Sequence, residues 1–266
     1  MNQNKFTQIT LNWLLLLTTL TVNALANILP INGLNTGQVS NLYPNLFVPA
    51  GFTFSIWSII YILLITYVIA FPFYRFRSNT PPAIVHYLIA INPLFQLTCI
   101  INTLWVLAWH HLQMTICMAL MLLFLFTLIR IFKKVAAFEH LLSSKAKLLL
   151  ITPFVVYLAW ISVATIAQIT AALVKWNFQP GLLNEMQWSV LMVVIAILLA
   201  SFITLKFRVI SYAFVVAWAL WGIAQKQQVQ GPPLFWVPML GVVVLPLLSF
   251  IMLFQRKSES SNQPLA

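Results

Sequence analysis

Few side chains in this chain could carry out acid–base or ion-coupled chemistry. There is no aspartate, and the three glutamates, Glu139, Glu185 and Glu259, fall in predicted loops or in the C-terminal tail. General acid–base catalysis by paired carboxylates and carboxylate-coupled transport both need such groups at the site of action. Neither a glycine-rich phosphate loop nor a zinc-protease motif is present. The sequence therefore argues against a carboxylate-coupled pump and predicts no catalytic residue.

The four histidines do not form a convincing metal site. His110 and His111 are adjacent, so on a helix their side chains diverge by about 100° and cannot easily chelate one ion. They fall at the predicted outer end of a span, where an interfacial role is expected. His86 and His140 lie near the opposite boundary, with the same interpretation. No metal ligand is predicted.

A stronger candidate is an aromatic and polar face on a later apolar segment. Tyr157, Trp160, Ala164, Gln168 and Ala171 share one face by i+3 and i+4 spacing. Small residues let another helix approach, whereas tryptophan, tyrosine and glutamine offer hydrogen-bonding groups at a pocket wall. Trp160 also lies about half a span deep, away from the usual interfacial belt. Both a ligand pocket and helix packing are compatible with this face.

A polar stripe marks another apolar segment. Asn92, Gln96, Cys99 and Thr103 follow i, i+4, i+7 and i+11 spacing, with Asn102 at the edge. Buried amides need hydrogen-bond partners in lipid, so this stripe must face protein or a cavity. Interhelical hydrogen bonds are the favoured interpretation, and a ligand site is the alternative.

Lipid must be the solvent for most of the segments that position these residues. The chain has 266 residues, of which 62% are hydrophobic and only 6% charged, against about 25% charged in soluble domains. The apolar runs lack the alternation of a membrane β-barrel, so we predict an all-α polytopic membrane bundle of about eight helices. The predicted spans are Phe6–Leu29, Thr53–Tyr74, Ile84–Trp109, Met114–Phe132, Leu148–Val174, Gln187–Leu205, Ile210–Gln225 and Leu234–Phe254.

The basic residues predict how these spans are oriented. With the N-terminus inside, twelve of the fourteen Lys and Arg fall in inner segments, and only Lys175 and Lys226 fall outside. This positive-inside bias predicts cytoplasmic N- and C-termini in a bacterial-type cytoplasmic membrane. Because the charges lie between apolar runs and not on one polar face, the net charge of +11 does not indicate a nucleic-acid partner.

The first span has a second interpretation as a cleavable signal peptide. Lys5, the apolar run Leu14–Val22 and Ala24-Leu25-Ala26 correspond to the three parts of such a peptide. Cleavage would leave seven spans without changing the later topology. An uncleaved span is the preferred prediction.

Three motifs resemble the tryptophan-rich sensory protein (translocator protein, TspO/MBR) family. Pro49-Ala50-Gly51-Phe52-Thr53-Phe54-Ser55-Ile56-Trp57, followed by Tyr61, is similar to the entry motif P-x-G-W-x-F-x-x-W-x-x-x-Y of the family's second helix. Asn102 and Trp105 match N-x-x-W in the third helix. Tyr157-Leu158-Ala159-Trp160 and Ala164-Thr165 match Y-L-x-W-x-x-x-A-T in the fifth.

The resemblance implies a five-helix bundle with a ligand cavity closed by the first extracytoplasmic loop, about residues 30–48. The implied domains are residues 1–177 as the TspO-like bundle, 178–255 as three additional transmembrane helices and 256–266 as a disordered cytoplasmic tail. Family members bind hydrophobic ligands, notably porphyrins. Together with the aromatic face, this gives the expected ligand-binding residues: Trp57, Tyr61, Asn102, Trp105, Tyr157, Trp160, Ala164 and Gln168, with Thr165 in support.

Two departures from the family pattern affect the expected function. Phe52 replaces the first tryptophan of the entry motif and Gln168 replaces an asparagine, so porphyrin degradation, reported for some relatives, is not expected. We expect a non-enzymatic receptor, sensor or carrier of a hydrophobic ligand such as a porphyrin or haem, with no required cofactor. The alternative is a permease for a small solute that is not carboxylate-coupled. A homo-oligomer is compatible with the sequence.

Overall fold

The computed structural model describes residues 4–178, 181 and 183–261 and confirms the all-α prediction. Its described residues contain no strand. Three short 3₁₀ helices, η1 (Ile31–Gly33), η2 (Gly51–Ser55) and η3 (Glu139–Leu141), accompany the α-helices. The α-helices are α1 (Lys5–Ile28), α2 (Thr36–Asn41), α3 (Ile56–Phe76), α4 (Pro82–His110), α5 (Met114–Phe138), α6 (Ser144–Leu150), α7 (Thr152–Lys175), α8 (Glu185–Phe207), α9 (Ile210–Gln227) and α10 (Pro232–Ser261).

Seven of the helices in the described part of the chain are long and apolar enough to cross a membrane. They correspond to seven of the eight predicted spans, so this is a multi-pass membrane protein. The remaining predicted span forms α9, which is 18 residues long. Its last turn carries Gln225, Lys226 and Gln227, so the helix has fewer apolar residues than its neighbours.

The structure changes three of the predicted span boundaries. The predicted span Leu148–Val174 is broken at Ile151, where α6 ends and α7 begins. Pro153 lies in the first turn of α7, where its missing N–H removes no hydrogen bond of the helix. Helix α5 extends beyond residue 132 to Phe138. Helix α10 extends to Ser261, into the predicted tail, and residues 262–266 lie outside the described residues.

The described residues divide into two compact units. Unit 1 comprises the residues up to Pro44 together with Phe54–Phe178. Unit 2 comprises Asn45–Thr53 and the described residues after Phe178. Unit 1 therefore consists of two stretches of the chain. Unit 2 consists of the C-terminal helices together with the distant segment Asn45–Thr53.

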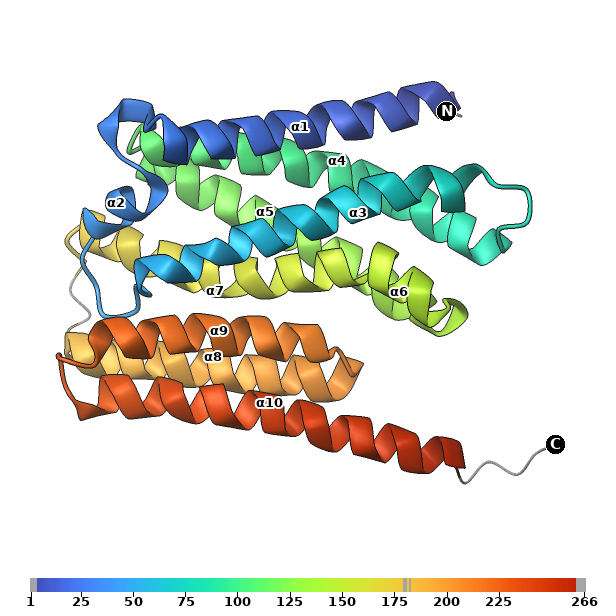
Figure 1. The fold of residues 1–266 in the computed structure, drawn as a ribbon. Helices are drawn as coiled ribbons and strands as arrows, with labels where there is room; N and C mark the ends of the chain where they lie inside the picture. The colour runs from blue at the N-terminus through green and yellow to red at the C-terminus, as the bar shows by residue number, and fades with distance from the viewer. Residues whose placement is uncertain (1–3, 179–180, 182, 262–266) are drawn as a thin grey trace. The chain divides into compact units, whose positions relative to one another are not determined.

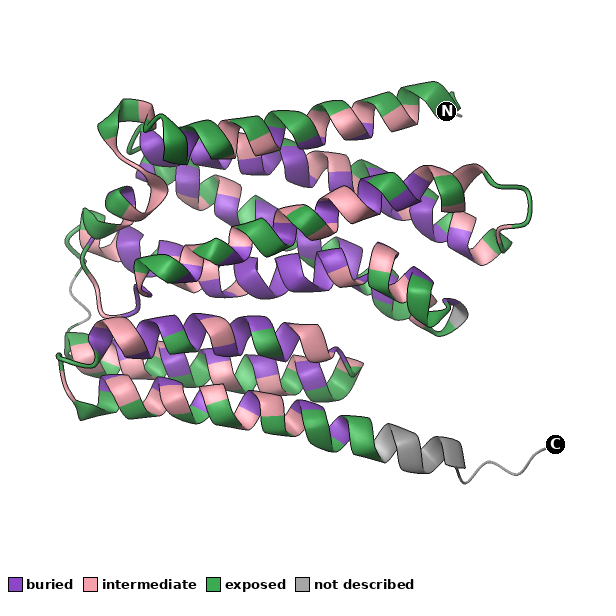
Figure 2. Ribbon diagram, viewed as in Figure 1, coloured by how far each residue is buried: buried purple, intermediate pink, exposed green. Residues whose placement is uncertain are grey.

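In unit 1, helices α4 and α7 hold the bundle together. Helix α4 packs against α1, α5 and α3, while α7 packs against α5, α3 and α6 (Figure 1). The most apolar stretch of α7 is 72% buried, against 22% for that of α1. Figure 2 shows the same contrast, with α7 largely buried and α1 exposed along much of its length. The predicted aromatic face therefore lies on the most buried span.

Polar side chains join α1 to α4 along much of their length. Asn12 donates to Asn92 at 2.7 Å and accepts from Gln96 at 2.8 Å. Thr19 donates to the Cys99 carbonyl at 3.0 Å and lies 3.1 Å from the Thr103 hydroxyl. The predicted polar stripe is thus used for interhelical hydrogen bonding, which was the favoured interpretation.

One end of unit 1 collects basic residues from the start of α1 and the end of α3. The Lys5 ammonium lies 5.5 Å from the centre of the Phe76 ring, and the Arg75 guanidinium lies 5.0 Å from the same centre. These two residues belong to segments that the charge bias assigns to the same side of the membrane. Their proximity agrees with that alternation of spans.

In unit 2, helices α8, α9 and α10 pack against one another (Figure 1). The segment Asn45–Thr53 is hydrogen-bonded to α9: Ala50 N donates to Gly222 O at 2.9 Å and Trp218 Nε1 donates to Thr53 O at 3.0 Å. Gln227 adds a bond to the Val48 carbonyl at 3.2 Å. The absence of a side chain at position 222 is required, because a Cβ there would collide with Thr53.

Candidate functional site: an aromatic cluster in unit 1

Four of the predicted site residues meet in one aromatic cluster, formed by Trp57 and Tyr61 of α3 and Tyr157 and Trp160 of α7. Trp57 stacks on Tyr61 with ring centres 5.6 Å apart, because i and i+4 residues lie above one another on a helix. The Trp57 ring is also nearly perpendicular to the rings of Tyr157 and Trp160. The ring centres lie 5.9 Å apart for Tyr157 and 6.1 Å apart for Trp160. Edge-to-face geometry of this kind is favourable for aromatic rings.

Two phenylalanines complete the aromatic cluster. Phe54 of η2 packs edge-on against Trp160 at 6.1 Å, and Phe124 of α5 packs edge-on against Tyr157 at 5.0 Å. Four elements thus contribute rings, and α7 lies at their centre. Neither phenylalanine was among the predicted ligand-binding residues. Phe54 occupies the F position of the entry motif, whereas Phe124 has no spacing that separates it from ordinary core residues.

A relay of amides holds the polar edge of the aromatic cluster. Asn23 of α1 donates to Asn102 of α4 at 2.7 Å, and Asn102 donates in turn to the Tyr157 hydroxyl at 2.7 Å. Asn102 is fully buried, so its bond to Tyr157 is made away from water, whereas the bond from the half-buried Asn23 is only partly shielded. The relay fixes the amide orientation of Asn102 and connects the predicted third-helix motif to the predicted fifth-helix motif.

Trp160 is a predicted site residue whose buried indole N–H makes no hydrogen bond in this arrangement. Its side chain is 3% exposed, and its Nε1 has no hydrogen-bond partner among the described residues. A buried donor without a partner is uncommon and carries a free-energy cost. The aromatic cluster therefore combines stacking surfaces with an unused donor, and it contains no ionised group.

Trp105 and Gln168 form a second pair, between α4 and α7. Trp105 Nε1 donates to Gln168 Oε1 at 3.2 Å, and Gln168 Nε2 donates to the Met114 sulfur at 3.0 Å. Both Trp105 and Gln168 are buried. Their hydrogen-bonding groups are thus committed to one another, unlike the Trp160 N–H.

The remaining motif residues have simpler surroundings. Ala164 is half-buried and lies one helical turn from both Trp160 and Gln168. Thr165 is buried, and its hydroxyl donates to the Ile161 carbonyl at 2.7 Å within the same helix. Threonine hydroxyls commonly bond in this way inside helices, so Thr165 has no free donor for a ligand.

The first loop is held on the C-terminal end of α4 by a buried histidine. His110 lies 3.1 Å from the Thr36 hydroxyl through Nε2 and 3.2 Å from the Ile31 carbonyl through Nδ1. Asn32 donates to the His110 carbonyl at 3.1 Å, and Trp109 donates to the Thr36 carbonyl at 3.3 Å. His110 is fully buried, whereas its neighbour His111 is exposed. The interfacial role expected for His110 is therefore wrong, because its side chain is buried and bonded to the first loop; the same role stays a prediction for the exposed His111.

The position of Phe52 differs from that of the other entry-motif aromatics. Phe52 belongs to unit 2, where its ring centre lies 5.5 Å from that of Trp218 and 4.9 Å from that of Trp221. The residue that departs from the family motif therefore packs with α9. Trp218 and Trp221 of α9 are both used in this contact.

One contributor to the site could have been found from the sequence. Asn12, Thr19 and Asn23 follow i, i+7 and i+11 spacing on the first span and match the stripe on the third. Asn23 is therefore the missed polar residue of the site. Among the described residues, no three His, Cys, Asp or Glu side chains gather in a way that could hold a metal ion.

Comparison with known proteins places the whole bundle within one family model. The model described as TSPO-like protein matches residues 8–251. This match extends far beyond residue 177 and includes α8, α9 and most of α10. No curated protein and no solved structure matches the chain.

Proposed function

Because this chain belongs to the TSPO-like protein family, we propose that it is a membrane receptor or carrier that binds a hydrophobic ligand at the aromatic cluster of unit 1. The ligand class we propose is a flat tetrapyrrole such as protoporphyrin or haem. The observation that supports this most strongly is the buried, unpartnered Trp160 N–H among aromatic rings packed edge-to-face. A ligand carbonyl or carboxylate would accept from it while the flat ring stacks on the aromatic faces.

The arrangement of the aromatic cluster suggests how a ligand would enter. Trp57 is half-buried, whereas Asn102, Tyr157 and Trp160 are buried. Rotation of Trp57 would open the aromatic cluster without breaking the hydrogen bond between Asn102 and Tyr157. The ligand would then take the place of the Trp57 ring against Tyr157 and Trp160, and it would accept a hydrogen bond from the Trp160 N–H.

The basic residues of unit 1 support a membrane orientation for the protein. Lys5 and Arg75 lie at the end of unit 1 that the charge bias assigns to the inside. We place this end, and both termini, on the cytoplasmic side of a bacterial-type membrane. The proposed activity is binding because the aromatic cluster supplies stacking surfaces and two buried polar groups without partners among the described residues, the Trp160 N–H and the Tyr61 hydroxyl.

A spectroscopic titration of the purified full-length protein tests the proposal. The Soret band of protoporphyrin is followed in mild detergent for the wild type, Trp160→Phe, Trp160→Ala and the control Trp236→Phe, whose side chain is 66% exposed on α10. We expect saturable micromolar binding, weakened about fivefold in Trp160→Phe through loss of one hydrogen bond and further in Trp160→Ala. Trp236→Phe should bind as the wild type does.

Equal affinity in all four proteins would reject the aromatic cluster as the ligand site.

Flux measurements separate a carrier from a receptor. Porphyrin movement into proteoliposomes that exceeds movement into protein-free vesicles would identify a carrier, and saturable binding without such flux would identify a receptor.

A further inference from the structure

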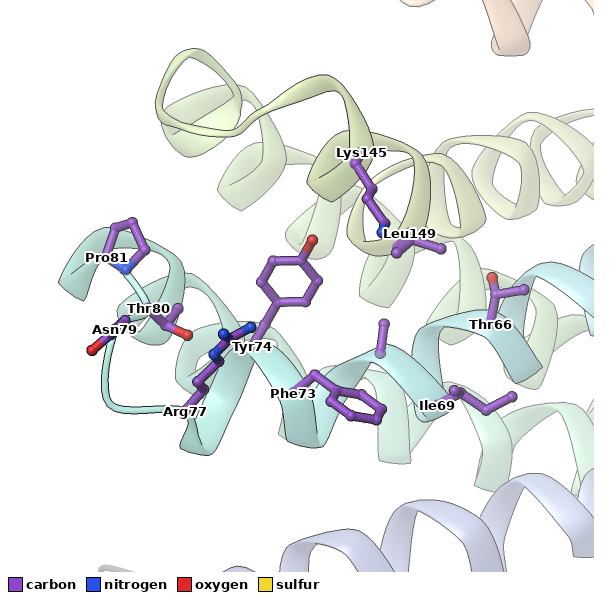
Figure 3. A pocket seen from close by; sticks show the side chains of 11 residues that line it. Thr66, Ile69, Phe73, Tyr74, Arg77, Asn79, Thr80, Pro81, Lys145 and Leu149 are labelled. Carbon is purple, nitrogen blue, oxygen red and sulfur yellow. The ribbon is translucent and has the colours of Figure 1, made fainter.

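A groove separate from the aromatic cluster lies at the basic end of unit 1. Its volume is about 680 Å³, within the usual range for ligand pockets. It runs between the C-terminal half of α3, the loop before α4, and α6 (Figure 3). None of the predicted site residues lines it. Its lining residues are Thr66, Ile69, Ala70, Phe73, Tyr74, Arg77, Asn79, Thr80, Pro81, Lys145 and Leu149.

Most of the polar side chains that line the groove, namely Tyr74, Arg77, Asn79 and Thr80, lie where α3 leads into α4, while Thr66 lies at the other end (Figure 3). Arg77 and Lys145 are its two cations, and both are exposed. Figure 3 shows Tyr74 pointing from α3 toward the helix that carries Lys145, with Arg77 beside it. Asn79 and Thr80 line the same end, directly before the N-terminus of the 29-residue helix α4. The positive end of that helix dipole adds to the charge of the two side chains.

Among the described residues, no ion pair joins either of these cations to a carboxylate. Glu139 is the only acidic residue before residue 185 in the sequence. It is engaged by Lys147, with Nζ and Oε1 3.2 Å apart. The positive end of the groove is therefore suited to an external anion.

Apart from Thr66, the other end of the groove is apolar and open to the surroundings. Phe73 is 68% exposed and Ile69 is 49% exposed, although both are large hydrophobic residues. Such exposure on a membrane-spanning helix is suited to contact with acyl chains, not water. Thr66 and Arg77 are 11 residues apart, which corresponds to about 16 Å along a helix. This distance is close to half of the roughly 30 Å hydrocarbon thickness, the depth of one leaflet.

We propose that this groove binds one anionic phospholipid of the leaflet at the basic end. Arg77 and Lys145 hold the phosphate, and Tyr74 and Thr80 offer hydroxyl groups to it. One acyl chain lies along α3 beside Phe73, Ile69 and Ala70. The charge at one end and the exposed apolar wall at the other together select a lipid over a soluble anion.

Native mass spectrometry of the full-length protein in a neutral detergent tests this proposal. The probes are phosphatidylglycerol and phosphatidylcholine with identical acyl chains. The test variant carries Arg77→Gln and Lys145→Gln. The control carries Lys133→Gln and Lys134→Gln, which removes the same charge from exposed positions of α5 that do not line the groove.

We expect the affinity for phosphatidylglycerol to fall roughly 30-fold in the test variant and to change little in the control. Binding of phosphatidylcholine should be similar in all three proteins. An equal loss in both variants would show only diffuse attraction to a basic surface and would overturn the proposal, as would wild-type affinity in the test variant. Displacement of the lipid by equimolar glycerol 3-phosphate would show a soluble-anion site and would also overturn it.

Discussion

Asn102 of α4 and Tyr157 of α7 are joined by a 2.7 Å hydrogen bond in which the amide donates to the phenol oxygen. Both residues are buried, and Asn102 also accepts from Asn23 of α1 at 2.7 Å. Three helices that are far apart in sequence are therefore connected through one amide. The ring of Tyr157 is held by this bond at the position where it packs with Trp57 and Phe124.

Replacing Asn102 by leucine should destabilise unit 1. Two interhelical hydrogen bonds are lost, each worth about 0.6 kcal/mol on average in membrane proteins, and the Tyr157 hydroxyl stays buried without its donor. We expect a loss of about 1–2 kcal/mol in unfolding free energy, seen as a lower thermal midpoint in detergent. Asn27→Leu is the control, because Asn27 is exposed and bonds only to the Asn23 carbonyl of its own helix. Equal midpoints for the two variants would contradict the structural role of Asn102.

His110→Phe should release the first loop from the end of α4. The substitution keeps an aromatic ring but removes the groups that bond to Thr36 and Ile31. Hydrogen–deuterium exchange in residues 31–43 should become faster, because local opening no longer breaks these bonds. His111→Phe changes the exposed neighbouring histidine and should leave that exchange unchanged. Faster exchange in both variants, or in neither, would argue against His110 as the residue that holds the loop.

Gly222→Ala should disturb the packing of Asn45–Thr53 on α9. The added Cβ would collide with the Thr53 side chain, and overpacking of this kind typically costs about 1–3 kcal/mol. We expect a lower thermal midpoint, partly restored when Thr53→Ala removes the colliding hydroxyl and methyl groups. Gly51→Ala, which meets no atom within 4 Å, serves as the matched control. A midpoint for Gly222→Ala equal to that of the control would refute this close approach.

The first span should remain in the mature protein. Cleavage near Ala26 would remove Asn12, Thr19 and Asn23, which together make five hydrogen bonds to α4. Intact mass spectrometry of protein purified from membranes should therefore give about 30.3 kDa for the untagged chain. A mass lower by the first 26 residues would support the signal-peptide interpretation instead.

Much of the fold could be predicted from composition and apolar run length. The all-α membrane bundle follows from 62% hydrophobic and 6% charged residues, which leave few alternatives in lipid. Boundaries were harder to predict. Pro153 was visible in the sequence, yet the break it allows at Ile151 depends on how α6 packs against α3 and α7. Hydropathy does not report that packing.

The candidate site was predicted less completely than the fold. Trp57, Tyr61, Asn102, Tyr157 and Trp160 were selected from motifs and spacing, and the structure brings them together. Phe124 was missed because a phenylalanine in an apolar run has no distinguishing pattern. Phe54 was not selected although it occupies the F position of the entry motif. Asn23 was missed although its spacing from Asn12 and Thr19 was readable. The bond between Trp105 and Gln168 depends on the relative rotation of two helices, which spacing along one helix does not determine.

The most direct test of the central proposal is fluorine NMR of full-length protein labelled with 5-fluorotryptophan. The Trp160 resonance is assigned by its absence from Trp160→Phe, and the exposed Trp236 resonance serves as an internal control. We predict that protoporphyrin shifts the Trp160 resonance saturably while the Trp236 resonance stays in place. A Trp160 resonance that is unmoved at saturating porphyrin would show that the ligand does not reach the aromatic cluster, and the proposed binding site would be wrong.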